Sequence, residues 1–176
     1  MVRVLKFLVY FFFFIVMLYM TFPKTNAFYK VEELVSAYKV RLVPESMHER
    51  LFSLEVEHMS IVYEGVKAAE LAQTEILFLG LYNNIDIEDV RLVGIVKNFM
   101  PSKIAFVHIS YSLLHPLTIK AEAKGDFGAA KLFYSLQEKK VLVELQPSTL
   151  MQQQFQSSLG LFKKSKDGVY YYEKSL

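Results

Sequence analysis

Hydrophobic and polar positions follow three successive patterns along this chain of 176 residues. An uninterrupted apolar run covers residues 7–22, and residues 27–41 then repeat apolar positions at helical spacing. From Phe52 onward most segments alternate between apolar and polar residues, which is the period of a β-strand with one solvated face. The chain therefore predicts an apolar helix, an amphipathic helix and a β-rich body.

The apolar run reads FLVYFFFFIVMLYMTF and predicts a transmembrane helix. Counted from Val4, with the Lys6 amine extended to the interface, it spans about 28 Å. Arg3 and Lys6 precede the run, so the positive-inside rule places the N-terminus in the cytoplasm. The side chains assigned to the membrane anchor are Phe7, Leu8, Phe11, Phe12, Phe13, Phe14, Ile15, Val16 and Leu18.

Two other interpretations of this run stay open. Thr25-Asn26-Ala27 is similar to a signal-peptide cleavage site, although the apolar core is longer than the roughly 7–15 residues of a signal peptide. The run is also compatible with a buried helix of a soluble protein. An uncleaved anchor and a cleaved signal both export residues 28–176. We expect residues 1–26 to form a signal anchor and residues 27–176 a single exported domain.

Residues 27–41 predict a short amphipathic helix. Asn26 is the expected N-cap, and Glu32 and Glu33 lie near the positive end of the helix. One stripe is apolar and is expected to pack on the following sheet: Phe28, Val31, Leu34, Val35 and Tyr38. A helix that lies on the membrane surface is the alternative.

The remaining chain predicts antiparallel strands at roughly 8–12 residue spacing. They are expected over residues 52–63, 66–72, 76–81, 85–95, 105–113, 117–124, 132–136, 141–145 and 169–172. Gly125-Asp126-Phe127-Gly128 reads as a turn, and Ser148 as the N-cap of a helix that ends at Gly160. The expected fold is mainly β: an N-terminal transmembrane helix plus a single antiparallel, curved β-sheet or open barrel with short flanking helices.

Composition and charge narrow the classes of function. Hydrophobic residues make up 53% of the chain and charged residues 22%, which is typical of a folded domain. The net charge is +2, and residues 28–176 are nearly neutral with 17 basic and 18 acidic groups. A nearly neutral body argues against nucleic acid as the main partner. With no Cys, the chain has no disulfide, zinc–thiolate site or thiol nucleophile.

Residue motifs offer no recognisable catalytic or cofactor site. The four histidines, at 48, 58, 108 and 115, lack the spacing of a zinc helix. Asp86, Glu88 and Asp89 form a small acidic cluster that lacks the ligands and glycine of a calcium loop. There is no P-loop, GxSxG or GxGxxG motif. We therefore expect no enzymatic activity, no metal and no cofactor.

The strands carry more apolar side chains than one face of a small core requires. A candidate apolar groove is formed by Val107, Ile109, Tyr111, Leu117 and Ile119. It fits an acyl chain, a partner helix or a partner strand. The alternative is an ordinary filled core.

The order of segments resembles a known family. An apolar anchor leads into FYKVEEL at residues 28–34, LFSL at 51–54 and IVYEGVKA at 61–68. The most specific part is LTIKAEAKGDFG at 117–128 followed by VLVELQPS at 141–148. This pattern, over residues 1–160, resembles the type II secretion system protein N family and, more loosely, the AsmA-type envelope proteins.

The resemblance implies a non-enzymatic protein of the bacterial inner membrane whose C-terminal domain lies in the periplasm. Its partners would be inner-membrane secretion or envelope-transport proteins, which it would serve as an adaptor or structural subunit in type II secretion. The alternative is an anchored lipid-handling module with an apolar β-groove. That architecture resembles the periplasmic membrane-anchored component of lipopolysaccharide transport.

Overall fold

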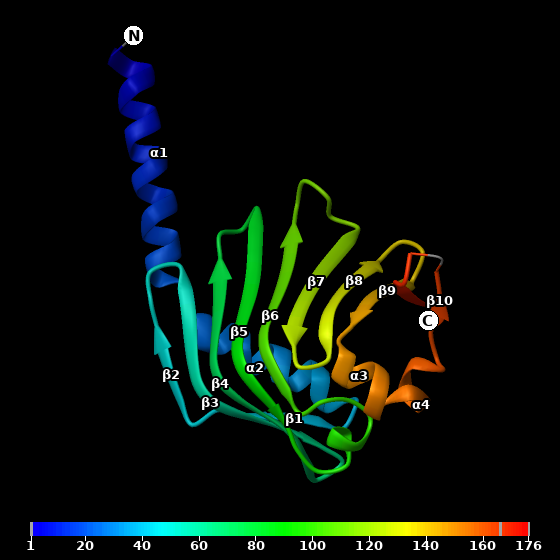
Figure 1. Ribbon diagram of the computed structural model, residues 1–176. Helices are drawn as coiled ribbons and strands as arrows, with labels where there is room; N and C mark the ends of the chain where they lie inside the picture. The colour runs from blue at the N-terminus through cyan, green and yellow to red at the C-terminus, as the bar shows by residue number, and fades with distance from the viewer. Residues whose placement is uncertain (1, 166, 176) are drawn as a thin grey trace.

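The computed structural model describes residues 2–165 and 167–175. Helix α1 (Val2–Thr21) projects away from the rest of the molecule, as Figure 1 shows. At 1.5 Å per residue this helix is about 30 Å long, close to the thickness of the hydrocarbon layer of a bilayer. None of its apolar window from Arg3 to Thr21 is buried against the protein.

The body of the molecule is one antiparallel sheet of 11 strands, which confirms the expected mainly β fold with a curved, open sheet. The order is β1-β3-β4-β5-β6-β7-β8-β9-β11-β10, with β2 paired beside β1 on β3. The strands are β1 (Val40–Val43), β2 (Ser46–Glu49), β3 (Ser53–Tyr63), β4 (Val66–Phe78), β5 (Tyr82–Leu92), β6 (Lys103–Ser112), β7 (Thr118–Gly125), β8 (Gly128–Ser135), β9 (Lys140–Pro147), β10 (Lys163–Lys164) and β11 (Tyr170–Ser175).

The strands alternate so that one face of the sheet is apolar and the other mainly polar, with Leu77, Phe133 and Leu142 among the residues of the polar face. Directly paired residues point to the same face. One row across the apolar face is Leu54, Ile76, Ile85, Ile109, Ala121, Leu132, Val143 and Tyr172. The next row, on the polar face, is Glu55, Glu75, Asp86, His108, Glu122, Lys131, Glu144 and Tyr171.

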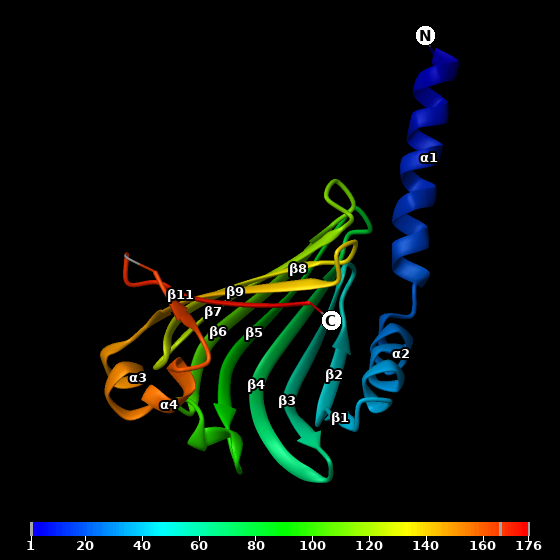
Figure 2. The same cartoon turned by 90° about the vertical axis from the view of Figure 1, so that its right-hand side faces the viewer.

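The sheet is strongly twisted and bent. In Figure 2 the strand directions change steadily from the steep β3 and β4 to the nearly horizontal β9. The bend coincides with residues of left-handed backbone conformation in two strands, His58 at φ 47° and Asp89 at φ 48°. Left-handed residues inside strands are uncommon and locally interrupt the extended geometry. This bend separates the hairpin ends near α1 from those at the opposite end.

Helix α2 (Lys24–Ser36) covers the apolar face at its first strands. Phe28 is only 3% exposed and packs in one buried cluster with Leu54, Val56, Met59, Ala69, Leu71 and Val90. The helix therefore packs on the sheet as expected, but through Phe28 and not through the whole predicted stripe, because Val31, Leu34 and Tyr38 are exposed. Its predicted start was wrong, because the helix begins three residues before Ala27 and its N-cap is Pro23, not Asn26.

A distant residue caps α2 in place of a neighbouring side chain. The backbone N–H of Thr25 donates to Oε1 of Glu49 at 2.8 Å, so a carboxylate from β2 sits at the positive end of the helix. This hydrogen bond lowers the pKa of Glu49. Sequence-local rules do not find a cap that lies 24 residues away along the chain.

Two short helices, α3 (Thr149–Gln154) and α4 (Gln156–Leu159), cover the apolar face at its other end. Met151 and Leu159 pack in a second buried cluster with Phe127 and Leu145. The predicted N-cap is confirmed, because Oγ of Ser148 accepts the backbone N–H of Met151 at 3.1 Å. The helix is broken at Phe155, so two short helices replace the single one expected.

Several predicted boundaries were wrong. Val40 and Arg41 belong to β1 and not to the preceding helix, and β2 was missed. The strands expected at 66–72 and 76–81 form one strand, β4, because Thr74 between them is a buried residue of the apolar face. The strand expected at 85–95 is β5 over 82–92, and the loop after it contains a 3-10 turn at Val96–Asn98.

Candidate functional site

The apolar face of the sheet is only partly covered by the helices. The two buried clusters occupy its ends under α2 and under α3 and α4. The clusters meet at Ile104, which packs against both, and beside them, toward the β6–β7 connection, lies an open strip of half-buried side chains that belong to neither cluster and do not pack on one. We define the open strip as Ile85, Ile109, Tyr111, Ile119, Ala121, Leu132, Tyr134, Val141 and Val143.

Strand register brings the strip together from five strands. Ile85, Ile109, Ala121, Leu132 and Val143 are paired in one row across β5 to β9. Tyr111, Ile119, Tyr134 and Val141 form the second row, one step nearer to the connection between β6 and β7. The result is a continuous apolar surface two side chains deep, which fits an elongated apolar ligand better than a compact polar one.

Four of the five predicted groove residues lie on this apolar face. Ile109, Tyr111 and Ile119 are in the open strip, and Val107 packs on the edge of the α2 cluster. Leu117 does not join them. It lies in the connection between β6 and β7 and is exposed, since β7 begins only at Thr118. Sequence alternation missed the contribution of β8 and β9, namely Leu132, Tyr134, Val141 and Val143.

The nine predicted anchor side chains all lie on α1. Phe7, Leu8, Phe11, Phe12, Phe13, Phe14 and Leu18 are exposed, and Ile15 and Val16 are half-exposed. The helix is long and apolar enough to cross a membrane, a property that single-pass anchors share with signal sequences. Moving each large apolar side chain from water into an apolar environment is favourable by about 1.5–3 kcal/mol.

Specific contacts join α1 to the domain. The ring of Tyr19 meets that of Phe52 edge-on at 5.6 Å, and Phe22 packs against Phe78 at 6.0 Å. The buried Lys24 amine donates to the carbonyl oxygens of Tyr19 and Phe22 at 3.3 and 3.4 Å. A cation at these carbonyls interacts favourably with the negative end of the α1 dipole. The end of α1 is thus fixed against β3 and β4.

The polar face carries a histidine, His108, in close contact with a carboxylate. Nδ1 of His108 lies 2.5 Å from Oδ1 of Asp86, and Asn84 donates to the other carboxylate oxygen. The Phe106 ring stacks on the imidazole at 6.2 Å. The imidazole is half-buried and its Nδ1 has a carboxylate partner, so we interpret His108 as a structural residue of β6.

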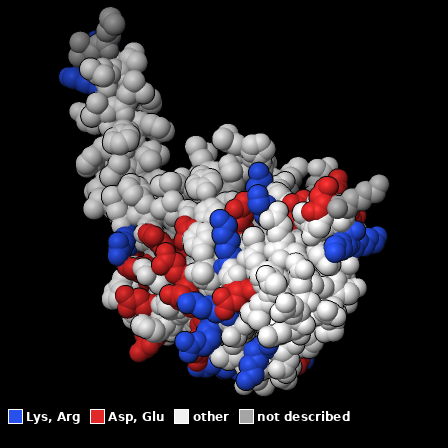
Figure 3. Space-filling view, viewed as in Figure 1, with Lys and Arg blue, Asp and Glu red and all other residues white. Residues whose placement is uncertain are grey.

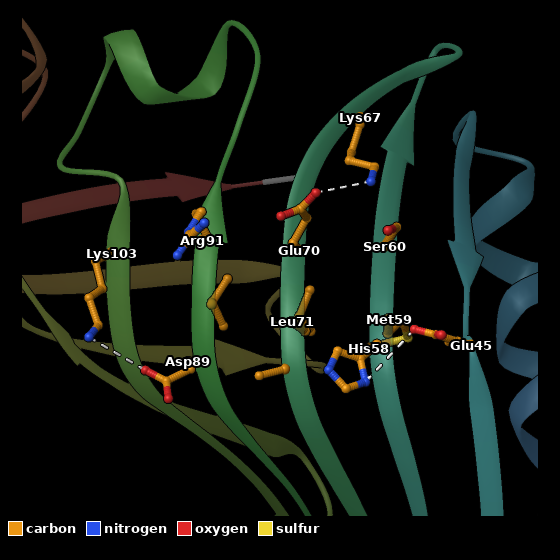
Figure 4. A pocket seen from close by; sticks show the side chains of 12 residues that line it. Glu45, His58, Met59, Ser60, Lys67, Glu70, Leu71, Asp89, Arg91 and Lys103 are labelled. Carbon is orange, nitrogen blue, oxygen red and sulfur yellow. Dashed lines mark hydrogen bonds and ion pairs between the residues drawn. The ribbon is translucent and has the colours of Figure 1, made fainter.

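A hollow of about 590 Å³ lies on the sheet where the strands bend, as Figure 4 shows. Its lining holds three acidic and three basic residues, and three ion pairs lie at it, while Arg91 forms none in the part of the chain that the structure describes. Lys67 contacts Glu70 at 3.0 Å, Lys103 contacts Asp89 at 3.7 Å, and His58 contacts Glu45 at 3.8 Å. Because cations and anions compensate each other, the hollow shows no preference for a ligand of one charge.

Charges of both signs also occur together on the wider surface. Figure 3 shows acidic and basic side chains intermingled on one face of the molecule, without a large field of one sign. Within residues 2–165 and 167–175, no three His, Cys, Asp or Glu side chains are grouped to hold a metal ion. Asp86 and Asp89, from the predicted acidic cluster, are engaged with His108 and Lys103 respectively. The open strip is therefore the strongest candidate site.

Comparisons of this chain with family models, curated proteins and solved structures found no match.

Proposed function

We propose that this protein is a non-enzymatic, membrane-anchored adaptor or structural subunit of a bacterial secretion assembly. In this proposal α1 spans the inner membrane and the sheet domain lies in the periplasm. The open strip binds an apolar segment of an inner-membrane partner. The anchor raises the effective concentration of the domain for partners in the same membrane.

The observation that carries the proposal is the half-buried open strip beside the two buried clusters. A filled core would bury these side chains as completely as Val56, which is 0% exposed. An apolar surface that remains accessible beside an anchoring helix is typical of a protein or lipid binding site. The compensated charges elsewhere support a binding role over chemistry at a polar site.

A lipid-handling module is the second candidate, and one observation favours it. The row formed by Tyr111, Ile119, Tyr134 and Val141 lies next to the hairpin connections near α1, so the strip is open toward the anchor. An acyl chain leaving the membrane would meet this row first. Both candidates place the ligand on the same side chains, and they differ in what is bound.

The test compares charge substitutions at adjacent positions of β7. Ile119→Asp places a carboxylate on the open strip, whereas Lys120→Asp places the same group on the exposed polar side. Val56→Asp buries a carboxylate in the first cluster and serves as the unfolding control, since an unpaired buried charge costs several kcal/mol. Each full-length variant is extracted from membranes of a Gram-negative host in mild detergent and measured by native mass spectrometry.

The adaptor proposal predicts that the full-length chain is extracted together with a bound protein. This bound protein is expected to be absent from Ile119→Asp and present in Lys120→Asp. Circular dichroism is expected to show Ile119→Asp folded and Val56→Asp unfolded. A stoichiometric lipid that disappears only in Ile119→Asp favours the lipid-handling candidate. Unfolding of Ile119→Asp to the extent of Val56→Asp contradicts both candidates, because the strip would then be core.

A further inference from the structure

Exposed leucines gather on the strand connections at one end of the sheet. Leu114 is 80% exposed and Leu81 is 67% exposed. We define the apolar rim as the exposed apolar residues of three neighbouring connections: Leu79, Leu81, Tyr82, Leu113, Leu114, Leu117 and Leu136. Solitary exposed leucines are ordinary, but a contiguous group of this size marks an interaction surface.

Backbone hydrogen bonds make the rim continuous. The N–H of Leu113 donates to the carbonyl of Leu81 at 2.8 Å, which joins the β4–β5 and β6–β7 connections. The N–H of Leu136 donates to the carbonyl of Leu117 at 2.8 Å, which joins the β6–β7 and β8–β9 connections. Three loops that are far apart in the sequence therefore form one edge of the domain.

The rim lies at the α1 end of the molecule. Figures 1 and 2 both show the hairpin tips of β4–β5 and β6–β7 on the side from which α1 rises. The hydroxyl of Tyr19 reaches the β4–β5 connection so closely that a Cβ added at Gly80 would lie 2.7 Å from it. Only Phe22 and Pro23 separate α1 from α2, a link of roughly 7 Å at full extension. The domain therefore stays beside the end of α1.

The chemistry of the rim matches lipid better than water. Residues 79–82 (LGLY) and 113–117 (LLHPL) contain no Lys, Arg, Asp or Glu. Leucine and tyrosine side chains are typical of protein groups that enter the boundary between lipid headgroups and acyl chains. On the face drawn in Figure 3, acidic and basic side chains lie side by side at the left and centre of the view, next to a broad area without charged residues.

We propose that the apolar rim docks into the bilayer surface, so that the domain lies against the membrane instead of moving freely on its anchor. This inference rests on the proposed anchoring of α1. Docking directs the open end of the strip toward the membrane and thereby fixes the side from which an apolar ligand approaches. Because the rim connections of 79–82 and 113–117 are uncharged, and Glu138 and Lys139 of the third connection have opposite charges, the contact is expected to persist at high salt.

The absence of Trp from the chain permits a direct test. Single variants Leu114→Trp and Leu81→Trp place a fluorophore on the rim, and Ile95→Trp places one on an exposed apolar position of the opposite end. Phe13→Trp reports on α1 itself. The full chain is reconstituted in vesicles of phosphatidylethanolamine and phosphatidylglycerol that contain phosphatidylcholine brominated at shallow or deep acyl positions.

The expected result is a blue-shifted emission of Leu114→Trp and Leu81→Trp with quenching by shallow bromines several-fold greater than for Ile95→Trp. The difference is expected to remain at high salt. Rim variants that are quenched no more than Ile95→Trp, while Phe13→Trp is strongly quenched, overturn the docking and leave the anchor intact. An unquenched Phe13→Trp overturns the anchor and the docking together.

Discussion

Removal of the Phe28 side chain is expected to destabilise the domain more than any other change in α2. The ring is 3% exposed and joins six buried side chains of the sheet. A buried Phe→Ala change typically costs about 3–5 kcal/mol, because transfer energy is lost and a cavity remains. The exposed neighbour Tyr29 provides the matched control, since it contacts Phe28 at a centroid distance of 5.9 Å but is 50% exposed.

The assay is thermal unfolding of the full chain in one detergent, followed by far-ultraviolet circular dichroism. For a protein of this length a loss of about 3–5 kcal/mol lowers Tm by roughly 6–20 °C. We expect that decrease for Phe28→Ala and a much smaller one for Tyr29→Ala. Equal decreases for the two variants would refute the packing of α2 on the sheet and, with it, the boundary between covered and open parts of the apolar face.

Two further changes test local features. Gly128 has φ +114°, and a Cβ there would collide with the carbonyl oxygen of Gln146. Gly65 also has a positive φ of +83°, but a Cβ added there meets nothing within 4 Å. Gly128→Ala is therefore expected to lower Tm clearly more than Gly65→Ala. Backbone strain of about 1–3 kcal/mol applies at both positions, so the collision alone distinguishes the two variants, and equal Tm values would contradict the close approach of Gly128 to Gln146. The hydrogen bond from Thr25 lowers the folded-state pKa of Glu49, so its contribution to stability is present above the unfolded pKa of about 4.3 and is lost as the pH falls through the folded value. Chemical denaturation of Glu49→Gln is expected to show reduced stability at neutral pH and no difference from the wild type in acid; a difference that does not depend on pH would contradict the cap.

The sequence predicts the sheet well because alternation directly reports which side chains share a face. The pattern of β6 and β7 is long and regular, so Val107, Ile109, Tyr111 and Ile119 are placed on the apolar face from sequence alone. The four-residue strands β1 and β2 are too short to show a period, and both were missed.

Other features depend on contacts that are distant in the sequence. The start of α2 is set by Glu49 and not by the adjacent Asn26. Which part of the apolar face stays open depends on where α2, α3 and α4 pack, and no local pattern encodes that. The apolar rim was missed as a unit because Leu81, Leu114 and Leu136 become neighbours only through strand pairing.

The central claim is that the apolar face binds a partner while the polar face does not. Tyr111 in the open strip and Phe106 on the polar face are half-buried aromatic residues of the same strand. Each is replaced in turn by the photo-crosslinking analogue benzoylphenylalanine in the full chain, and intact bacterial membranes are irradiated. Mass spectrometry of the adducts is expected to identify one defined membrane protein, or a lipid for the second candidate, at position 111 and little at position 106. Equal adducts at both positions, or none at position 111, would contradict the account.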